Sequence, residues 1–213
     1  MFKILSSAIV LGCCSVMCMS ATPVDCTTLS NLQQYVDQSA LGGCFVQDKL
    51  FTGFTYTGGG AETASDVKVS ATLSTLPGID IHGFTLVPDL VWTADFTVGY
   101  TISVMTPNSG VSIVAALDQI NLGPLGNATT AVSTKSNGEV YNLNQSALTQ
   151  SSGFSGVNSL SSMTSVTIPE GSFLISLEEQ YTQTVENIPE PGTLLMITGG
   201  LLGLGFFRRR KSA

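Results

Sequence analysis

The stretch FTVGYTISV, residues 96–104, alternates apolar and small polar residues along its whole length. The apolar positions are Phe96, Val98, Tyr100, Ile102 and Val104. Successive side chains of a β-strand point to opposite faces, so an alternation with period two is typical of a strand with one buried face. The stretch therefore predicts a strand that packs its apolar face against a core.

The same alternation recurs on both sides of this stretch. Further apolar faces lie at Val67, Val69, Ala71 and Leu73; at Val111, Ile113, Ala115 and Leu117; and at Phe173, Ile175, Leu177 and Tyr181. Ile79-Asp80-Ile81-His82 resumes the pattern after the turn Pro77-Gly78, which places His82 at an exposed sheet position. Residues 146–165 are rich in Ser, Asn and Gly, and they fit either a long surface loop or a hairpin with a polar outer face. Short strands between Gly, Pro and Asn turns predict a mainly β domain, a single antiparallel β-sandwich or barrel-like fold.

One short helix is expected before the first strand. Ser30 and Gln33 form a capping-box pattern, and apolar residues follow at helical spacing. Gly42-Gly43 supplies a left-handed exit from this helix. The first strand is then expected over residues 45–56.

The start of the chain has the features of a secretory signal peptide. Met1-Phe2-Lys3 is a short cationic region, an uncharged apolar stretch follows, and small residues before Ala21 suit cleavage there. We therefore assign residues 1–20 to a signal peptide. A lipoprotein signal ending at Cys13 is the rival interpretation, although a leucine just before the preceding glycine fits the lipobox poorly.

The end of the chain combines three elements in a fixed order. Pro189, Glu190 and Pro191 come first, an apolar run without charge spans residues 193–207, and the basic cluster Arg208, Arg209, Arg210 and Lys211 follows at once. The prolines end any preceding strand, the run can partition into a bilayer, and the basic cluster stays on the cytoplasmic side. A comfortable span needs about 20 residues. This shorter, glycine-containing run predicts a marginal transmembrane helix, which suits a transient sorting element better than a permanent anchor.

This order resembles the PEP-CTERM sorting signal of bacterial exported proteins. The resemblance implies that residues 188–213 are a substrate for an exosortase-type membrane transpeptidase with a cysteine nucleophile, which removes the tail near the Pro-Glu-Pro. The chain would then be the substrate and would supply no catalytic residue. A plain tail anchor is the alternative.

Two cysteines, Cys26 and Cys44, remain once the signal peptide is removed. An even pair in an oxidising compartment predicts one disulfide. A reactive thiol or a metal ligand is the alternative, but no histidine neighbours either cysteine in the sequence. The pair, with the aromatic stretch at residues 51–56, also resembles exported PEP-CTERM proteins of unassigned function, and that resemblance implies no activity.

The region between the two signals is strongly acidic. All fifteen acidic residues lie from Asp25 to Glu190, against the three lysines Lys49, Lys68 and Lys135, for a net charge of −12 over residues 25–190. A polyanion is repelled by such a surface, so a nucleic-acid partner is not expected.

Patterns that indicate catalysis or a metal site are missing from the sequence. His82 is the single histidine, and neither a Gly-x-Ser-x-Gly elbow nor a zinc-ligand cluster is present. Carboxylates that a glycosidase or a calcium site would use are available at Asp80, Asp89, Asp95, Asp118, Glu178 and Glu179, but no EF-hand pattern orders them. Trp92 is in phase with Leu90, Ala94 and Phe96, which favours core packing over sugar stacking. We expect no enzyme activity, no cofactor and no metal.

Together these features predict an exported, non-enzymatic cell-surface or extracellular-matrix protein with one β domain at residues 21–187. It would be membrane-anchored as a precursor and later lie in the cell envelope or outside the cell. The expected partners are the exosortase and the membrane, with extracellular polysaccharide as a further candidate. The alternative is an extracellular carbohydrate- or calcium-binding β-sandwich module that uses loops at one end of the sandwich.

Overall fold

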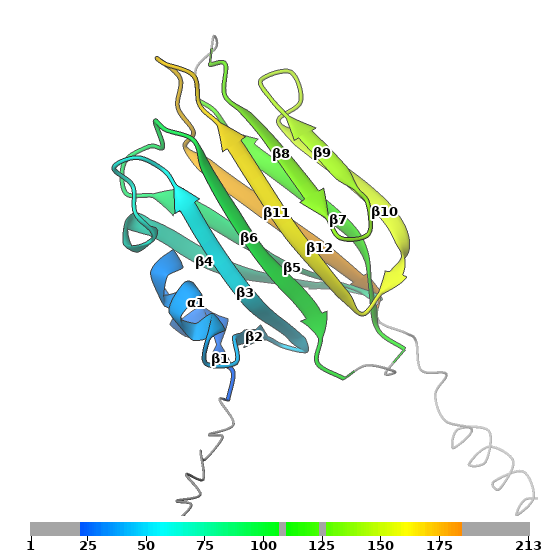
Figure 1. The fold of residues 1–213 in the computed structure, drawn as a ribbon. Helices are drawn as coiled ribbons and strands as arrows, with labels where there is room; N and C mark the ends of the chain where they lie inside the picture. Colours follow the sequence, from blue (N-terminus) through cyan, green and yellow to red (C-terminus); the bar gives the residue numbers. More distant parts are fainter. Residues whose placement is uncertain (1–21, 107–109, 124–126, 185–213) are drawn as a thin grey trace, which may run out of the picture.

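Two β-sheets face each other in the computed structural model, and the apolar core lies between them (Figure 1). The structure describes residues 22–184 except 107–109 and 124–126. The predicted signal peptide at residues 1–20 and the predicted sorting segment at residues 188–213 lie outside the described residues. Within the described ranges, no helix has both the length and the apolar character that a membrane crossing requires.

The larger sheet has seven strands in the order β1-β2-β3-β6-β11-β8-β9. These strands span Val24–Asp25, Cys44–Val46, Lys49–Gly58, Phe96–Val104, Ser159–Thr167, Thr130–Lys135 and Val140–Leu143. The smaller sheet has five strands in the order β10-β7-β12-β5-β4, which span Thr149–Val157, Ser112–Asn121, Ser176–Thr184, Ile79–Pro88 and Val67–Leu76. All neighbouring strands are antiparallel except β1 and β2. The predicted mainly β fold is therefore confirmed, and its two sheets are antiparallel-rich.

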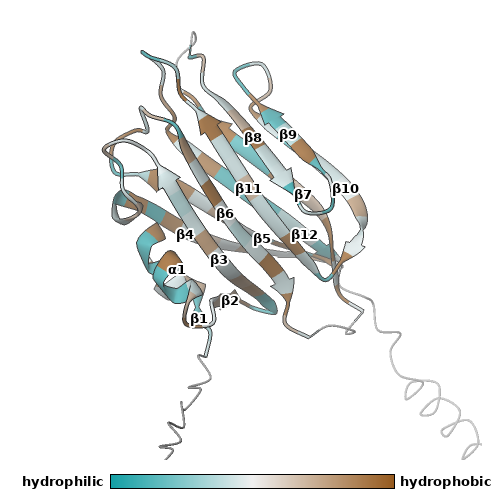
Figure 2. Ribbon diagram, in the orientation of Figure 1, coloured by the Kyte–Doolittle hydropathy of each residue, from teal (hydrophilic) through white to brown (hydrophobic). Residues whose placement is uncertain are grey.

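Strand β6 lies in the middle of the larger sheet, between β3 and β11. Its apolar positions are all buried, as the alternation predicts, and Thr97, Thr101 and Ser103 stand on its other, less buried face. Figure 2 shows brown and pale residues alternating along the strands of this sheet. The period-two pattern of the sequence therefore carries over directly into the core.

Bulges change the phase of two strands and account for positions where the sequence misleads. In β3 the register shifts between Thr52 and Thr55 around Gly53, whose φ is 65°, so that Phe51 and Phe54 are both buried. In β7 the pairing partners shift in register, and burial passes from Ile113 to Ala116 rather than to the predicted Ala115 and Leu117. The extra residue in a bulge reverses which side chains face the core.

The N-terminal region differs from expectation in detail. Helix α1 spans Leu32–Ser39, and its N-cap is Asn31, whose side chain accepts a hydrogen bond from the Gln34 amide; the predicted Ser30–Gln33 capping box is wrong by one position. Gln34 Oε1 in turn accepts a hydrogen bond from the Ser30 amide at 2.7 Å. The helix start therefore has paired side-chain-to-backbone hydrogen bonds in both directions, as in a capping box. Both glycines at 42–43 have positive φ, as predicted.

The predicted single strand over residues 45–56 is two strands, β2 and β3, that pair as a hairpin. Gln47 lies in the turn between them with a φ of 56°, in the left-handed region. Two short 3₁₀ helices, η1 (Cys26–Thr28) and η2 (Ala64–Asp66), flank α1 in the sequence. Tyr35 of α1 packs edge-on against Phe54 and Phe84, with ring centroids 5.0 and 5.4 Å apart, which seats the helix against the core.

Residues 146–165 are neither a long loop nor a simple hairpin. They contain most of β10 and β11, which belong to different sheets and are joined through Asn158. Strand β10 pairs with β7 at the edge of the smaller sheet, whereas β11 lies inside the larger one. A polar composition therefore conceals two strands, because both expose a Ser- and Thr-rich face.

Candidate functional site

A group of polar and charged side chains is buried between the two sheets where an apolar core would be expected. We call it the Lys135 cluster; it consists of Lys135, Asp118 and Glu179 with the hydroxyls of Tyr100, Ser162, Thr164 and Tyr181. The side chains of the three ionisable residues are at most 1% exposed. Dissolved substrates therefore cannot reach these side chains, and the groups of the cluster interact only with one another and with the surrounding protein.

Three strands position the ionisable groups of the Lys135 cluster. Asp118 on β7 and Glu179 on β12 are direct cross-strand partners in the smaller sheet, and Lys135 belongs to β8 of the larger one. Figure 1 shows these three strands in the two facing sheets. Lys135 Nζ lies 3.0 Å from Asp118 Oδ1, 2.9 Å from Asp118 Oδ2 and 3.2 Å from Glu179 Oε2. It also donates to Ser162 Oγ at 2.7 Å. One ammonium thus bridges two carboxyl groups of the opposite sheet.

Hydroxyl groups hold Glu179 in place. Tyr100 OH donates to Glu179 Oε2 at 2.9 Å and Ser162 Oγ donates to the same oxygen at 2.7 Å, while Thr164 Oγ1 donates to Oε1. Hydrogen bonds to a carboxylate stabilise its ionised form. Glu179 therefore has an environment suited to a negative charge despite its burial.

The pKa values of the three groups are displaced in different directions. Burial, followed by repulsion from Glu179, raises the pKa of Asp118 to about 7. Burial also opposes the charge on Glu179, but the Lys135 charge and the donated hydrogen bonds outweigh it and lower the pKa. Burial opposes the charge on Lys135 as well, yet its neighbours, Glu179 first, outweigh it and raise the pKa. At neutral pH the cluster therefore holds an ammonium, an ionised Glu179 and an Asp118 that is partly protonated.

A second buried polar group contains His82 and corrects the prediction that this residue is exposed. The His82 cluster consists of Asp48, Lys49, Asp80, His82 and Gln183. His82 is fully buried on β5. Alternate residues of a strand point to the same face, so His82 and Asp80 face the core together with Phe84 and Leu86. The phase read from Ile79 was wrong, since Ile79 is exposed at the end of the strand.

Ion pairing in the His82 cluster is less complete than in the Lys135 cluster. Lys49 Nζ lies 2.9 Å from Asp48 Oδ1, and His82 Nε2 lies 3.8 Å from the same oxygen. Among the described residues, neither ring nitrogen of His82 has a hydrogen-bond partner. Burial, followed by the positive charge of Lys49, lowers the pKa of His82 to about 4, and burial lowers the pKa of Lys49. His82 is therefore a neutral imidazole at physiological pH.

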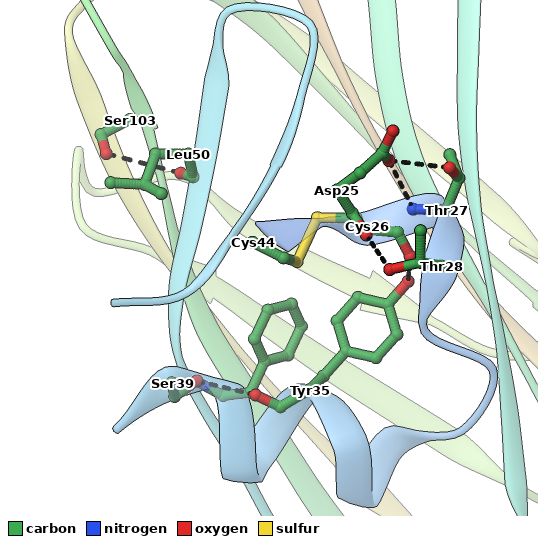
Figure 3. The surroundings of a disulfide bond; sticks show 10 residues. Asp25, Cys26, Thr27, Thr28, Tyr35, Ser39, Cys44, Leu50 and Ser103 are labelled. Atoms are coloured by element: carbon green, nitrogen blue, oxygen red, sulfur yellow. Dashed lines mark hydrogen bonds between the residues drawn. A yellow bond between two sulfur atoms is a disulfide. The ribbon is translucent and has the colours of Figure 1, made fainter. Parts of the chain in front are cut away.

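Cys26 and Cys44 are joined by a disulfide, so that prediction is confirmed and both thiols are consumed by a structural bridge (Figure 3). Their Cα atoms are 4.9 Å apart. Both residues are buried, and Tyr35 OH donates to the Cys26 carbonyl at 2.8 Å. The disulfide joins η1 to β2, and the hydrogen bond from Tyr35 joins α1 to η1. The helix and the first hairpin are therefore connected through the disulfide.

A shallow groove on the surface is the candidate for a small ligand. It has a volume of about 530 Å³ and is lined by Thr27, Leu29, Ser30, Asn31, Ser65, Lys68, Val69, Ser70, Ala71 and Asp89. Lys68 and Asp89 form an exposed ion pair at 2.7 Å within this lining. Its wall offers hydroxyl, amide and charged groups, and none of the described residues that line it has an aromatic face for sugar stacking.

The structure removes Trp92 from the candidates for sugar binding. Trp92 is fully buried, stacks on Phe96 at a centroid distance of 4.5 Å and donates from Nε1 to Tyr56 OH at 2.9 Å. Core packing is thus confirmed, although the strand phase behind it is not, because Leu90 is exposed.

The six candidate carboxylates are mostly scattered. Asp118 and Glu179 come together in the Lys135 cluster, Asp80 belongs to the His82 cluster, and Asp89 pairs with Lys68. Asp95 accepts from the Ile168 amide, and Glu178 accepts from Gln180 Nε2 on its own strand. Within the described ranges, no group of three or more His, Cys, Asp or Glu side chains is arranged to hold a metal ion. The pairing of Lys135 with two of these carboxylates could not be seen in the sequence, because the residues lie on separate strands and have no common motif.

The C-terminal segment matches a known sorting motif. Residues 187–211 match the family model of the PEP-CTERM protein-sorting motif. The C-terminal region is a PEP-CTERM sorting motif. The matched range contains Pro189, Glu190 and Pro191 and the cluster from Arg208 to Lys211. Such a motif indicates an exported protein whose membrane-associated precursor is sorted to the cell surface by an exosortase, a membrane enzyme.

The chain also has a distant similarity to a solved structure. No curated protein matches the chain. Among solved structures, the chain is similar to TmCBM61 in complex with beta-1,4-galactotriose, at 10% sequence identity and a TM-score of 0.29, over 57% of this chain and 90% of that one. A similarity at that score carries no argument about the fold or the function of this chain.

Proposed function

We propose that this chain is the precursor of a non-enzymatic cell-surface or extracellular-matrix protein, with a signal peptide at residues 1–20, a β domain at 21–187 and a removable sorting segment at 188–213. The single observation that carries this proposal is the PEP-CTERM motif at residues 187–211. The apolar run 193–207 is the transmembrane helix of the precursor, and Arg208, Arg209, Arg210 and Lys211 retain its end in the cytoplasm.

The β domain supports a structural role outside the cell. Its cysteines are oxidised, which fits a compartment where disulfides persist. All the ionisable residues of its two polar clusters except Asp48 are buried. These features suit a stable module that is displayed or incorporated in a matrix, with extracellular polysaccharide as the partner.

The test follows the fate of the tail. The full chain is expressed in a bacterium that contains an exosortase and in the same strain without it, and the intact mass of the product is measured from membrane, surface and medium. The expected product lacks both termini only when the exosortase is present, with the new C-terminus near Pro189–Pro191. Replacement of Arg208, Arg209 and Arg210 by glutamine should leave the tail uncleaved, whereas the matched exposed substitution Lys68→Gln should change nothing. A tail that persists in the exosortase-containing strain contradicts the proposal.

The second candidate function is a carbohydrate- or calcium-binding module, and the polar groove at Lys68 and Asp89 favours it. Calorimetric titration of the exported protein with neutral oligosaccharides and with Ca²⁺ tests it. Binding that is abolished by Asp89→Ala and kept by Glu139→Ala, an acidic residue outside the groove, would establish this module in place of a purely structural domain.

A further inference from the structure

Lys135 Nζ lies close to both carboxyl oxygens of Asp118. Nζ is almost equidistant from both carboxyl oxygens, at 3.0 and 2.9 Å, which places it opposite the carboxyl carbon rather than beside one oxygen. Both side chains are fully buried and come from opposite sheets. Reacting groups held about 3 Å apart in a fixed orientation gain a large effective concentration, because the entropy of encounter is already lost on folding.

We propose that Lys135 and Asp118 condense after folding into a side-chain amide, a covalent crosslink between β8 of the larger sheet and β7 of the smaller sheet, with Glu179 as the proton-transfer group. This crosslink goes beyond the sorting function, and it does not depend on that function.

The reaction needs no co-reactant. It starts from the Lys135 ammonium, the protonated Asp118 carboxyl and the Glu179 carboxylate, which together have no net charge. Glu179 takes a proton from Nζ, the free amine attacks Cγ of Asp118, and a tetrahedral adduct forms. Glu179 then returns a proton to the departing hydroxyl, which leaves as water, and accepts the remaining proton from the amide nitrogen. The products are a neutral amide, one water molecule and protonated Glu179, again without net charge.

The site favours the three protonation states from which this reaction starts. The raised pKa of Asp118, about 7, supplies the carboxylic acid, whose carbon is far more open to attack than that of a carboxylate. The lowered pKa of Glu179 supplies the base, 3.2 Å from Nζ. The raised pKa of Lys135 makes the ammonium the resting form, so transfer of its proton to Glu179 is the uphill step.

The surroundings also favour condensation over the reverse hydrolysis. Lys135 Nζ lies 5.3 Å from the ring centroid of Tyr181 and 5.6 Å from that of Tyr141, and both tyrosines are buried. A closed, aromatic site excludes the water that would hydrolyse the amide. Replacement of an ion pair by a neutral amide also removes two buried charges, whose desolvation is costly.

The crosslink would complement the disulfide. Cys26–Cys44 secures the β2 side of the larger sheet, while β8 lies near the opposite edge, next to β9. The amide would join the two sheets at that far side, where no cysteine is present. An exported protein with both bonds would resist unfolding and proteolysis from either side of the sandwich.

The deciding measurement is the mass of the wild-type protein. The exported full-length gene product is purified and denatured, and its intact mass is measured. This mass is compared with the mass calculated for the sequence between its observed termini, with the disulfide included. The proposal expects a mass lower by one water, and a chymotryptic digest in which the peptide with Asp118 is joined to the peptide with Lys135. A folded wild-type protein with the full open-chain mass overturns it, and the cluster is then a non-covalent ion pair.

Variants identify the chemistry. Asp118→Asn should lose ammonia in place of water, because the amine then attacks a carboxamide, and it should end at the same mass as crosslinked wild type. Lys135→Arg and Glu179→Gln should keep their open-chain masses, the first for lack of a nucleophile and the second for lack of a proton acceptor. A Glu179→Gln protein that crosslinks as completely as wild type would overturn the role of Glu179. The wild-type mass decides the crosslink itself even if a variant fails to fold.

Discussion

Lowering the pH should destabilise the folded domain through His82. The side chain is fully buried, and burial and the Lys49 charge hold its pKa at about 4, against 6.5 for an ordinary histidine. The charged groups that face it are Lys49, which opposes protonation, and Asp48 and Asp80, which favour it without outweighing the burial. Because the folded state disfavours the imidazolium, the unfolded chain binds a proton first as the pH falls.

The size of the effect follows from the two pKa values. A native pKa below the unfolded one means that stability is complete above about pH 6.5 and is lost as the pH falls toward 4. At 1.36 kcal/mol per pKa unit, the free energy of unfolding should drop by about 3 kcal/mol over this interval.

Urea denaturation of the exported protein, followed by the fluorescence of the single tryptophan, Trp92, measures this loss at pH values from 7.5 to 4. The control is His82→Gln, which keeps a neutral polar group and removes the titration. An uncrosslinked Asp118, with its pKa raised to about 7, acts with the opposite sign, since its contribution is lost as the pH rises. The difference between wild type and His82→Gln therefore isolates His82. Equal pH dependence in the two proteins would refute a buried, neutral His82.

Three further predictions concern stability in urea at neutral pH. Loss of the disulfide in Cys26→Ala/Cys44→Ala should lower the free energy of unfolding by about 3 kcal/mol, the chain-entropy value for a sequence separation of 18; a loss below about 1 kcal/mol would contradict it. Relative to the uncrosslinked protein, Lys135→Met should cost about 3–5 kcal/mol, because it leaves two buried carboxyl groups without their cation, and an unchanged denaturation midpoint would argue against the Lys135 cluster. Gly43→Ala should be more harmful than Gly53→Ala: both have positive φ, but a Cβ at Gly43 would lie 2.2 Å from a backbone carbonyl oxygen, whereas none of the described atoms lies within 4 Å of a Cβ at Gly53. Equal losses in the two glycine variants would contradict this contact.

Sequence patterns succeeded where a property is local. The alternation in β6, the turn at Pro77-Gly78 and the left-handed glycines at 42–43 depend on backbone preferences and on side-chain period within a few residues. The two cysteines could be paired by elimination, since no other cysteine remained. A local pattern misleads where one residue changes the phase, as at the bulge in β7, or where the end of a strand is exposed, as at Ile79 three residues before His82.

By itself the sequence determined the destination of this protein and the class of its fold. The Pro-Glu-Pro, the apolar run and the arginines of the sorting motif act as a linear signal, and period-two alternation alone is enough to indicate strands. Tertiary structure decided what the core contains. Asp118, Lys135 and Glu179 are far apart in the chain, and only the register of β7 with β12 and the packing of the sheets bring an amine against two carboxyl groups. These contacts depend on strand pairing between distant parts of the chain, and such pairing produces no repeating pattern in the sequence.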